Sequence, residues 1–298
     1  MASAVRGVIA TLYGQAPRSV RREHGGSISE CFVVELDGGE SARRPARVFV
    51  KLHDDEQVLR AEAAGLEAMQ ATRTVRVPAV LHVGAVGNTA YLVLEFLALR
   101  GQGSWSALGA ALAALHTATG PDRFGFETDN FLGRTPQNNA WEPSWIEFFR
   151  ARLAYQLDRL VESGVCSAQA DRAFLARVEA VSKRLDCFFD PHEKITPSLL
   201  HGDLWQGNWG FLALDGTPVV FDPAAYYGHH EAELAMMTLF GDPPQSFFDA
   251  YFAVIPKALR FEERVPLYQL YHGLNHMNLF GRSYQRMCDD LLSQLEAR

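Results

Sequence analysis

Residues 201–223 constrain the fold of this chain more than any other stretch. They read HGDLWQGNWGFLALDGTPVVFDP, a polar cluster followed by two short apolar runs. The Asp-Gly dipeptide at 215–216 separates those runs and predicts a β-hairpin, in which both central turn positions need positive φ. Such a hairpin brings Asp222 back toward Asn208 and Asp203, so two carboxylates and an amide are expected to converge.

The spacing of these three polar residues matches that of kinases. Asp203 and Asn208 are five positions apart, and Asp222 follows fourteen positions later, in the order of a catalytic-loop Asp and Asn and a metal-binding Asp. Their oxygen atoms suit Mg²⁺, a hard ion that shares its coordination shell with substrate phosphates. In that interpretation Asp203 takes the proton from the attacking hydroxyl, and Asn208 and Asp222 hold the metal. A capped loop with an ordinary acidic hairpin is the alternative.

Length and charge argue against several classes of protein. The 298 residues and 33.1 kDa allow one large domain or two lobes. A net charge of −7 with no basic stripe argues against a nucleic-acid partner. No apolar run approaches the ~20 residues that span a bilayer, and the N-terminus lacks the apolar core of a signal peptide. We therefore expect no membrane partner and a cytoplasmic location, with the oligomeric state left open.

None of the cysteines or paired histidines has the spacing of a metal site. Cys31, Cys166, Cys187 and Cys288 lack a C-x-x-C pattern, which argues against both a zinc site and a disulfide framework. The histidine pair at 229–230 has no accompanying cysteine or H-E-x-x-H pattern. A reduced compartment fits this cysteine usage.

The N-terminal third predicts a small, mostly antiparallel sheet with one helix. Apolar runs predict strands at 30–36, 47–51, 75–83 and 90–96, and apolar spacing predicts a helix at 56–71. Lys51 ends the second strand, where Glu62 or Glu67 of the helix could reach it, and Glu62 is the favoured partner. A strand lysine paired with a helix glutamate positions the α- and β-phosphates in kinases. A solvated strand end is the alternative.

Gly25, Gly26 and Ser27 precede the first of these strands. Glycines in such a loop let backbone N–H groups approach phosphates closely, because no Cβ stands in the way. Two glycines are also common in plain turns, so this feature is a weak signal by itself.

The last strand is followed by a Gly-Gln-Gly-Ser linker at 101–104, and the lobe boundary is predicted before it. Residues 1–97 would form a nucleotide-binding N-lobe, and residues 98–298 a helical C-lobe with the catalytic loop and the substrate site. The connector of kinases presents backbone groups to the adenine edge, which makes residues 95–97 candidates for that contact. A plain buried strand and loop is the alternative.

From residue 104 onward the apolar spacing is helical. Helices are predicted at 105–117, 141–163, 169–188, 231–240, 245–254 and 267–280. Between the first two, residues 124–139 read as an irregular polar and aromatic loop, and a loop of this length inside a compact lobe is often functional.

Seven strings between about residues 25 and 284 resemble the fructosamine-3-kinase (ketosamine kinase) family, in its bacterial type. They are GSISE at 26–30, VFVK at 48–51, VRVP at 75–78, PQxNxW at 136–141, HGDLWxGN at 201–208, DPAxYYGH at 222–229 and LNHxNxFG at 274–281, where x marks a position outside the resemblance. The string at 222–229 is specific, because kinases in general have Asp-Phe-Gly there.

The resemblance implies an α+β, two-lobed protein-kinase-like fold of the aminoglycoside-phosphotransferase type. It also implies ATP-dependent phosphorylation, with Mg²⁺, of the 3-hydroxyl of ketosamines (fructosamine, ribulosamine or erythrulosamine). These sugar–amine adducts arise by glycation of small amines or of proteins. The unstable phosphate ester then falls apart and frees the amine, which is a deglycation or repair reaction.

The resemblance also implies a role for each matching residue. The proton acceptor would be Asp203, the metal ligands Asn208 and Asp222, the phosphate-positioning pair Lys51 and Glu62, the phosphate loop Gly25, Gly26 and Ser27, and the adenine-side connector Glu95, Phe96 and Leu97. Trp205 would be a sugar-side residue, because an indole offers a flat apolar face to a sugar. His276 and Asn139 are further substrate candidates, or else polar residues with satisfied side chains.

Two departures from the family pattern matter. Ser27 stands where some relatives have a cysteine, with Cys31 just beyond it, which argues against a redox switch in this loop. Gln206 stands where relatives usually have a small residue, which leaves the preferred sugar open.

Two other functions are compatible with the kinase spacing. A kinase of the same fold that acts on an aminoglycoside, choline or homoserine would lack the string at 222–229. A non-catalytic nucleotide-binding relative should have lost a metal or base residue, yet Lys51, Asp203, Asn208 and Asp222 are all present.

Overall fold

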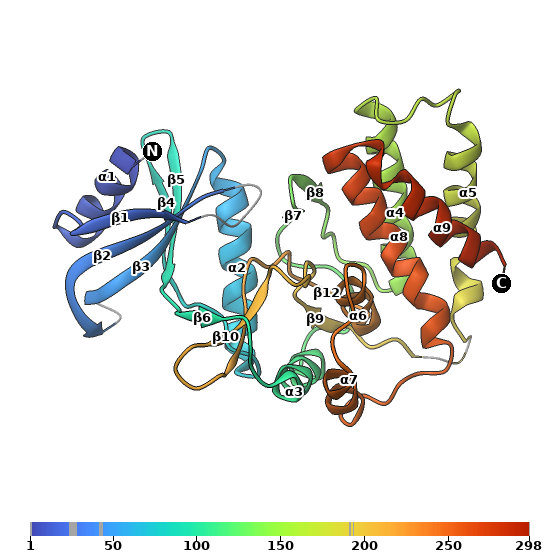
Figure 1. Cartoon of the computed structure of the whole chain (residues 1–298). Helices are drawn as coiled ribbons and strands as arrows, with labels where there is room; N and C mark the ends of the chain where they lie inside the picture. Colours follow the sequence, from blue (N-terminus) through green and yellow to red (C-terminus); the bar gives the residue numbers. More distant parts are fainter. Residues whose placement is uncertain (1, 24–28, 42–43, 191, 193, 298) are drawn as a thin grey trace. The chain divides into compact units, whose positions relative to one another are not determined.

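The computed structural model describes residues 2–23, 29–41, 44–190, 192 and 194–297. The chain divides into two compact units (Figure 1). Unit 1 combines Met1–Ser104 with Trp209–Ala224, and unit 2 combines Trp105–Asn208 with Ala225–Arg298. The segment at 209–224, expected in the C-lobe, thus packs with the N-terminal residues. The nucleotide-binding and substrate-binding roles assigned to the two lobes stay predictions.

Unit 1 is built on a five-stranded antiparallel sheet whose order is β1-β2-β3-β5-β4. Its strands are β1 (Ser19–Glu23), β2 (Glu30–Ser41), β3 (Arg44–His53), β4 (Val80–Val86) and β5 (Thr89–Glu95). Helices α1 (Ala2–Tyr13) and α2 (Glu56–Thr72) pack on its opposite faces (Figure 1). The antiparallel sheet with its α2 helix was predicted, whereas strand β1 was not, and the strand predicted at 75–83 begins only at Val80.

Successive side chains of β3 point to opposite faces of the sheet, one facing α1 and the other facing α2. Val48, Val50 and Leu52 lie in one buried cluster with the apolar side of α1. Because successive strand residues point to opposite faces, Lys51 points toward α2. The carboxylate of Asp55 caps the start of α2, where it accepts a backbone hydrogen bond of 2.8 Å from the second residue beyond it.

Residues 209–224 form the predicted hairpin, although its turn differs from the expectation. Strand β10 (Trp209–Leu212) pairs antiparallel with β11 (Pro218–Val220) and, on its other edge, with β6 (Leu99–Arg100). The connection spans residues 213–217, and Gly216 has positive φ (+78°) whereas Asp215 does not. The Asp215 carboxylate instead accepts a 2.9 Å hydrogen bond from the N–H of Thr217. The acid therefore caps a longer loop, and the expectation of two residues with positive φ was wrong.

Unit 2 is mostly helical. Its helices are α3 (Trp105–His116), α4 (Trp145–Glu162), α5 (Arg172–Lys183), α6 (His230–Thr238), α7 (Gln245–Phe252), α8 (Phe261–Phe280) and α9 (Gln285–Glu296), with short 3₁₀ segments η1 (Leu185–Phe188) and η2 (Arg282–Tyr284). Two small antiparallel pairs are present: β7 (Asn130–Leu132) with β8 (Thr135–Gln137), and β9 (Ser198–Leu200) with β12 (Tyr226–Gly228). Helix α8 packs against α4, α6 and α9. Within the described ranges, no helix has the length and apolar character needed to cross a membrane.

Three features of unit 2 differ from the sequence prediction. Helix α8 begins at Phe261 and continues through Pro266, whereas the predicted helix began only after the proline. Residues 124–139 contain the β7–β8 pair and are therefore not wholly irregular. Helix α9 was not predicted, although it buries Cys288, Leu292 and Leu295.

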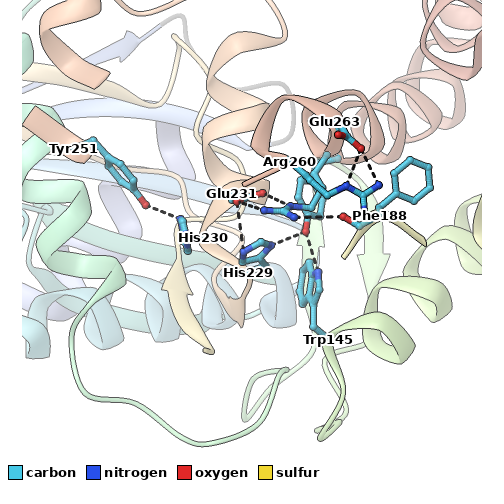
Figure 2. A network of polar contacts seen from close by, with 10 residues as sticks. Trp145, Phe188, His229, His230, Glu231, Tyr251, Arg260 and Glu263 are labelled. Atoms are coloured by element: carbon cyan, nitrogen blue, oxygen red, sulfur yellow. Dashed lines mark hydrogen bonds and ion pairs between the residues drawn. The ribbon is translucent and has the colours of Figure 1, made fainter. Parts of the chain in front are cut away.

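A buried polar network ties α4, α6 and α8 together (Figure 2). The Arg264 guanidinium donates to both oxygens of Glu231, at 2.6 and 2.7 Å, and both side chains are buried. The Tyr268 hydroxyl accepts a 3.0 Å hydrogen bond from Trp145 Nε1 and lies 2.7 Å from His229 Nδ1. The Tyr268 hydroxyl therefore links the indole of α4 to the imidazole that precedes α6.

A test of the helix packing in unit 2 uses Gly109 of α3, where a Cβ would lie 2.2 Å from the carbonyl oxygen of Phe247 on α7. We expect Gly109→Ala to push these helices apart and to lower the free energy of unfolding by about 1–3 kcal/mol. Gly7→Ala on α1 is the control, since its Cβ meets nothing within 4 Å, and should stabilise by about 0.5–1 kcal/mol. Urea unfolding measures both; equal stabilities would contradict the close approach.

Candidate active site

Unit 1 contains a cluster of three charged side chains around a buried lysine. Lys51 Nζ donates to Glu62 Oε1 at 2.7 Å and to Asp222 Oδ1 at 2.5 Å. The three side chains come from β3, α2 and the segment after β11, and Lys51 is only 4% exposed. Of the two α2 acids that could reach the lysine, Glu62 does so, and no contact of Glu67 with Lys51 is seen within the described residues. The cluster therefore links the sheet, the helix and the hairpin of unit 1.

One lysine charge serves two carboxylates in this cluster. Burial alone would lower the pKa of Lys51, but the charges of Asp222 and Glu62 outweigh it and raise that pKa, so the lysine stays protonated. Burial raises the pKa of Glu62 to about 7, against the lowering effect of Lys51, and the Asp222 charge adds to the rise. Asp222 thus competes with Glu62 for the same cation.

The backbone at Asp222 is in a conformation that an aspartate rarely adopts. Its φ is +61°, in the left-handed region where a Cβ is unfavourable. Strained residues of this kind persist only where their surroundings hold them. Here Lys51 holds the side chain, and the N–H of Val220, two residues earlier, donates a 3.0 Å hydrogen bond to the carbonyl of Arg76.

In unit 2, the loop formed by residues 201–208 (the 201–208 loop) is held by its own polar groups. Asn208 Nδ2 donates to the backbone carbonyl of Asp203 at 2.8 Å and to its Oδ2 at 3.2 Å. Gly202 has φ of +82°, which lets the chain turn sharply between the buried His201 and the acid. The asparagine therefore fixes the direction of the Asp203 carboxylate.

Glu233 of α6 anchors the start of the 201–208 loop, and the sequence analysis missed it. Its carboxylate accepts hydrogen bonds from the backbone N–H groups of His201 and Gly202, the latter at 3.1 Å. His116 Nε2 lies 3.6 Å from the same carboxylate, and His116 Nδ1 lies 2.7 Å from the hydroxyl of Tyr251. An acid inside the apolar run of α6 was the available signal, because a buried carboxylate needs donors.

Trp205 lies in the 201–208 loop with its indole 38% exposed. The ring covers Gly207 so closely that a Cβ there would lie 2.4 Å from the indole. Gly207 is thus required by the ring's position and not by an unusual φ. The exposed indole face is the part of Trp205 that a sugar could contact.

The other predicted substrate residues are used inside unit 2. Asn139 is wholly buried; its Nδ2 donates to Thr128 O at 2.9 Å, and its Oδ1 accepts from Arg152. In this structure Asn139 is therefore not accessible from solvent. His276 is half-buried, with Nδ1 2.7 Å from the carbonyl of His272, and burial lowers its pKa.

In the predicted adenine connector, residues 95–97, the side chain of Glu95 forms an ion pair. Both oxygens of Glu95 accept from Arg76 Nη2, at 2.5 and 2.6 Å. The guanidinium of Arg47 lies 5.0 Å from the centroid of the Phe96 ring. Leu97 follows β5 directly and is half-buried. The glycine loop at residues 25–27 lies outside the described residues.

The predicted residues thus fall into two groups. Lys51, Glu62 and Asp222 meet within unit 1, and Asp203 and Asn208 meet within unit 2. The expected convergence of Asp222 with the second group stays a prediction.

Comparison with known proteins shows which family this chain belongs to. It is 41% identical over 280 residues to a probable ketoamine kinase of Synechocystis, covering 92% of this chain and 89% of that protein. It is 42% identical over 246 residues to the chloroplastic protein-ribulosamine 3-kinase of Arabidopsis thaliana, covering 79% and 72%. The family model described as fructosamine kinase matches residues 1–298. The chain belongs to the fructosamine kinase family.

The fold of this fructosamine kinase family member is shared more widely. A crystal structure of a candidate fructosamine-3-kinase from Thermobifida fusca matches with a TM-score of 0.83 and 30% identity, over 99% of both chains. The aminoglycoside phosphotransferase APH(4)-Ia matches with a TM-score of 0.66 and 14% identity, over 100% of this chain and 98% of that one. The predicted protein-kinase-like fold of the aminoglycoside-phosphotransferase type is confirmed, and the second match concerns the fold alone.

Cys31 lies directly opposite Lys51 in the pairing of β2 with β3. Its side chain is buried, with Sγ 3.7 Å from the carbonyl of Ser29. Burial raises the pKa of Cys31 to about 11, although the charge of Lys51 opposes the rise. A buried thiol that stays protonated is a poor nucleophile, which agrees with the argument against a redox switch here.

The thiol chemistry gives a direct test of this environment. We expect iodoacetamide at pH 8 to label Cys187, which is exposed, and to leave Cys31 unlabelled until the protein unfolds. Peptide mass spectrometry over time measures each site, and Cys187→Ser should remove the fast fraction. Labelling of Cys31 in the same fast phase would show that the cluster around Lys51 is open.

Proposed function

We propose that this chain is an ATP-dependent kinase that phosphorylates the 3-hydroxyl of ketosamines. Its relatives named ketoamine kinase and protein-ribulosamine 3-kinase support this substrate class. The structural observation that carries the proposal is the buried contact of Lys51 with Glu62 and Asp222 in a chain of this family. A lysine held charged in that way is suited to offset the negative charge of ATP phosphates.

The two predicted metal ligands each offer an oxygen atom of a kind that Mg²⁺ binds. Asp222 offers a carboxylate that is 30% exposed, and Asn208 uses its Nδ2 on Asp203, which leaves its Oδ1 as the donor. Oxygen atoms of this kind are the ligands that Mg²⁺ prefers, with water and phosphates completing its shell. We assign both residues as metal ligands. The bound ion would supply charge neutralisation at the phosphates.

Asp203 is proposed as the proton acceptor. Phosphoryl transfer needs positioning and charge neutralisation more than covalent chemistry, so the protein must orient the attacking hydroxyl. The bond from Asn208 Nδ2 orients the Asp203 carboxylate, and Glu233 fixes the backbone just before it. Asp203 can then accept the hydrogen of a sugar hydroxyl and remove its proton as the phosphoryl group transfers.

Trp205 is proposed as the sugar-side contact, because its exposed indole offers an apolar face and an N–H donor. Gln206, also exposed, is the neighbour that would tune the choice among fructosamine, ribulosamine and erythrulosamine. Glycated protein amines and small ketosamines both fit this chemistry. We further propose a cytoplasmic setting, which four free cysteines favour.

Asp203→Asn tests the proton acceptor. We expect ATP binding to be retained and turnover to fall by about 10²–10⁴-fold, because the amide cannot take the proton. Asp215→Asn is the matched control, since this exposed acid only caps the turn of the hairpin, through an oxygen that the amide keeps, and has no proposed part in the reaction. Steady-state kinetics and calorimetric ATP titration measure the two effects. Turnover like that of the wild type in Asp203→Asn would remove this residue from the mechanism.

A substrate panel tests the reaction itself. ATP consumption should rise with ketosamines of fructose, ribulose or erythrulose and stay at background with aminoglycosides, choline and homoserine. The chain carries the string at 222–229 that kinases of those other alcohols lack. Consumption with an aminoglycoside or choline alone would favour the same-fold alternative. Binding of ATP without consumption by any acceptor would favour a non-catalytic relative.

A further inference from the structure

Arg76 and Glu95 form an ion pair that the proposed mechanism does not use. Nη2 of Arg76 donates to both carboxylate oxygens of Glu95, at 2.5 and 2.6 Å, and the side chains are 32% and 35% exposed. The second oxygen also accepts the backbone N–H of Ala79 at 3.2 Å, and Arg76 Nη1 donates to the carbonyl of Val77. The pair is therefore more restrained than an ordinary surface ion pair.

The backbone of Arg76 holds the hairpin that carries Asp222. Arg76 forms a parallel bridge with Val219 of β11, and its carbonyl accepts the N–H of Val220 at 3.0 Å. Asp222 is only two residues further along, in its left-handed conformation. The position of Arg76 thus bears directly on the position of this proposed metal ligand.

Glu95, the second member of the ion pair, is the first residue of the connector formed by residues 95–97. Glu95 is the last residue of β5, and its own N–H donates to the carbonyl of Ala79 at 2.9 Å. Just beyond the connector, the carbonyl of Ala98 accepts the N–H of Ala213 in the hairpin at 2.8 Å. The hairpin is therefore bonded to Ala98, just after the connector, and to Arg76, which the ion pair joins to Glu95 at the start of the connector.

The carboxylate of Glu95 has hydrogen-bond donors within the protein and does not depend on a nucleotide for them. Its oxygens already accept three hydrogen bonds from Arg76 and Ala79. A direct contact of this side chain with the adenine or the ribose would have only the remaining acceptor site of the carboxylate to use, beside the bound guanidinium. Its role is therefore to orient its neighbours, while any contact of residue 95 with adenine would use the backbone.

We propose that Arg76 and Glu95 are positioning residues that hold the connector and Asp222 in fixed register within unit 1. The affinity for ATP and the concentration of Mg²⁺ needed for activity then depend on this ion pair, whereas recognition of the ketosamine does not. This inference rests on the proposed function for its kinetic readout. Its binding readout requires only that the chain binds ATP.

Glu95→Gln and Arg76→Lys test the ion pair. Each keeps the approximate shape of the side chain but removes the charge or the paired donors. We expect ATP affinity, measured by calorimetry with Mg²⁺ present, to fall about tenfold, which is the loss of one charge-assisted contact. The Mg²⁺ concentration for half-maximal activity should rise, and the KM for the ketosamine should stay within about twofold.

Asp37→Asn is the matched control, because the ion pair of Arg18 with Asp37 is also in unit 1 but largely exposed. It should change none of these quantities. Circular dichroism and urea unfolding check that each variant folds. Should Glu95→Gln fail to fold, Arg76→Lys supplies the same test, because a cation remains beside Glu95. The charge-exchanged double variant Arg76→Glu with Glu95→Arg should recover part of the lost affinity.

The outcomes separate this inference from the proposed function. Unchanged ATP affinity and Mg²⁺ dependence in folded Glu95→Gln or Arg76→Lys overturn the inference. An equal rise in the KM for ATP and for the ketosamine also overturns it, because that pattern indicates general loosening. Loss of ATP affinity in the variants, with no ketosamine turnover by the wild type, supports the inference and rejects the proposed substrate.

Discussion

A buried lysine that contacts two carboxylates is the constraint on which unit 1 depends. Removing an ammonium group from water costs several kcal/mol unless opposite charges compensate it. Lys51 is almost fully buried, so Glu62 and Asp222 must both stay close to it. Asp222 lies 171 residues further along the chain than Lys51. The same contact therefore also fixes where the 209–224 hairpin joins the N-terminal sheet.

This arrangement explains why a strained residue can end the hairpin. An isolated aspartate would leave the left-handed region, whereas Asp222 gains a short ionic contact by staying in it. In the proposed reaction, phosphate oxygens would become further partners of Lys51, and the metal a further partner of Asp222. Lys51 thus holds the Asp222 carboxylate in the position from which it would bind the metal. When ATP is bound, Asp222 would share Lys51 with the phosphates. Glu62, partly buried on α2, would keep the lysine in place during that exchange.

The parts of the molecule that the sequence predicted depend on local patterns. The β-branched and aromatic run at 47–51 predicted the strand that ends at Lys51, and the apolar spacing at 56–71 predicted the helix that carries Glu62. The Asp-Gly dipeptide predicted the hairpin but not its turn, because Asp215 found a partner in Thr217 instead. Each of these signals lies within a few residues of the structure it predicts.

The residues that the sequence missed share one cause, and Asn139, whose substrate role stays a prediction, shows a related difficulty. Glu233 and the Arg76–Glu95 pair act through partners far along the chain, and no local pattern announces such partners. Conversely, Asn139 stands in a family string, but its side chain supports Arg152 inside unit 2. A string shared by a family preserves packing as well as chemistry, since both restrict the residue. Only the contacts of a side chain separate the two, and for Asn139 those contacts are all internal.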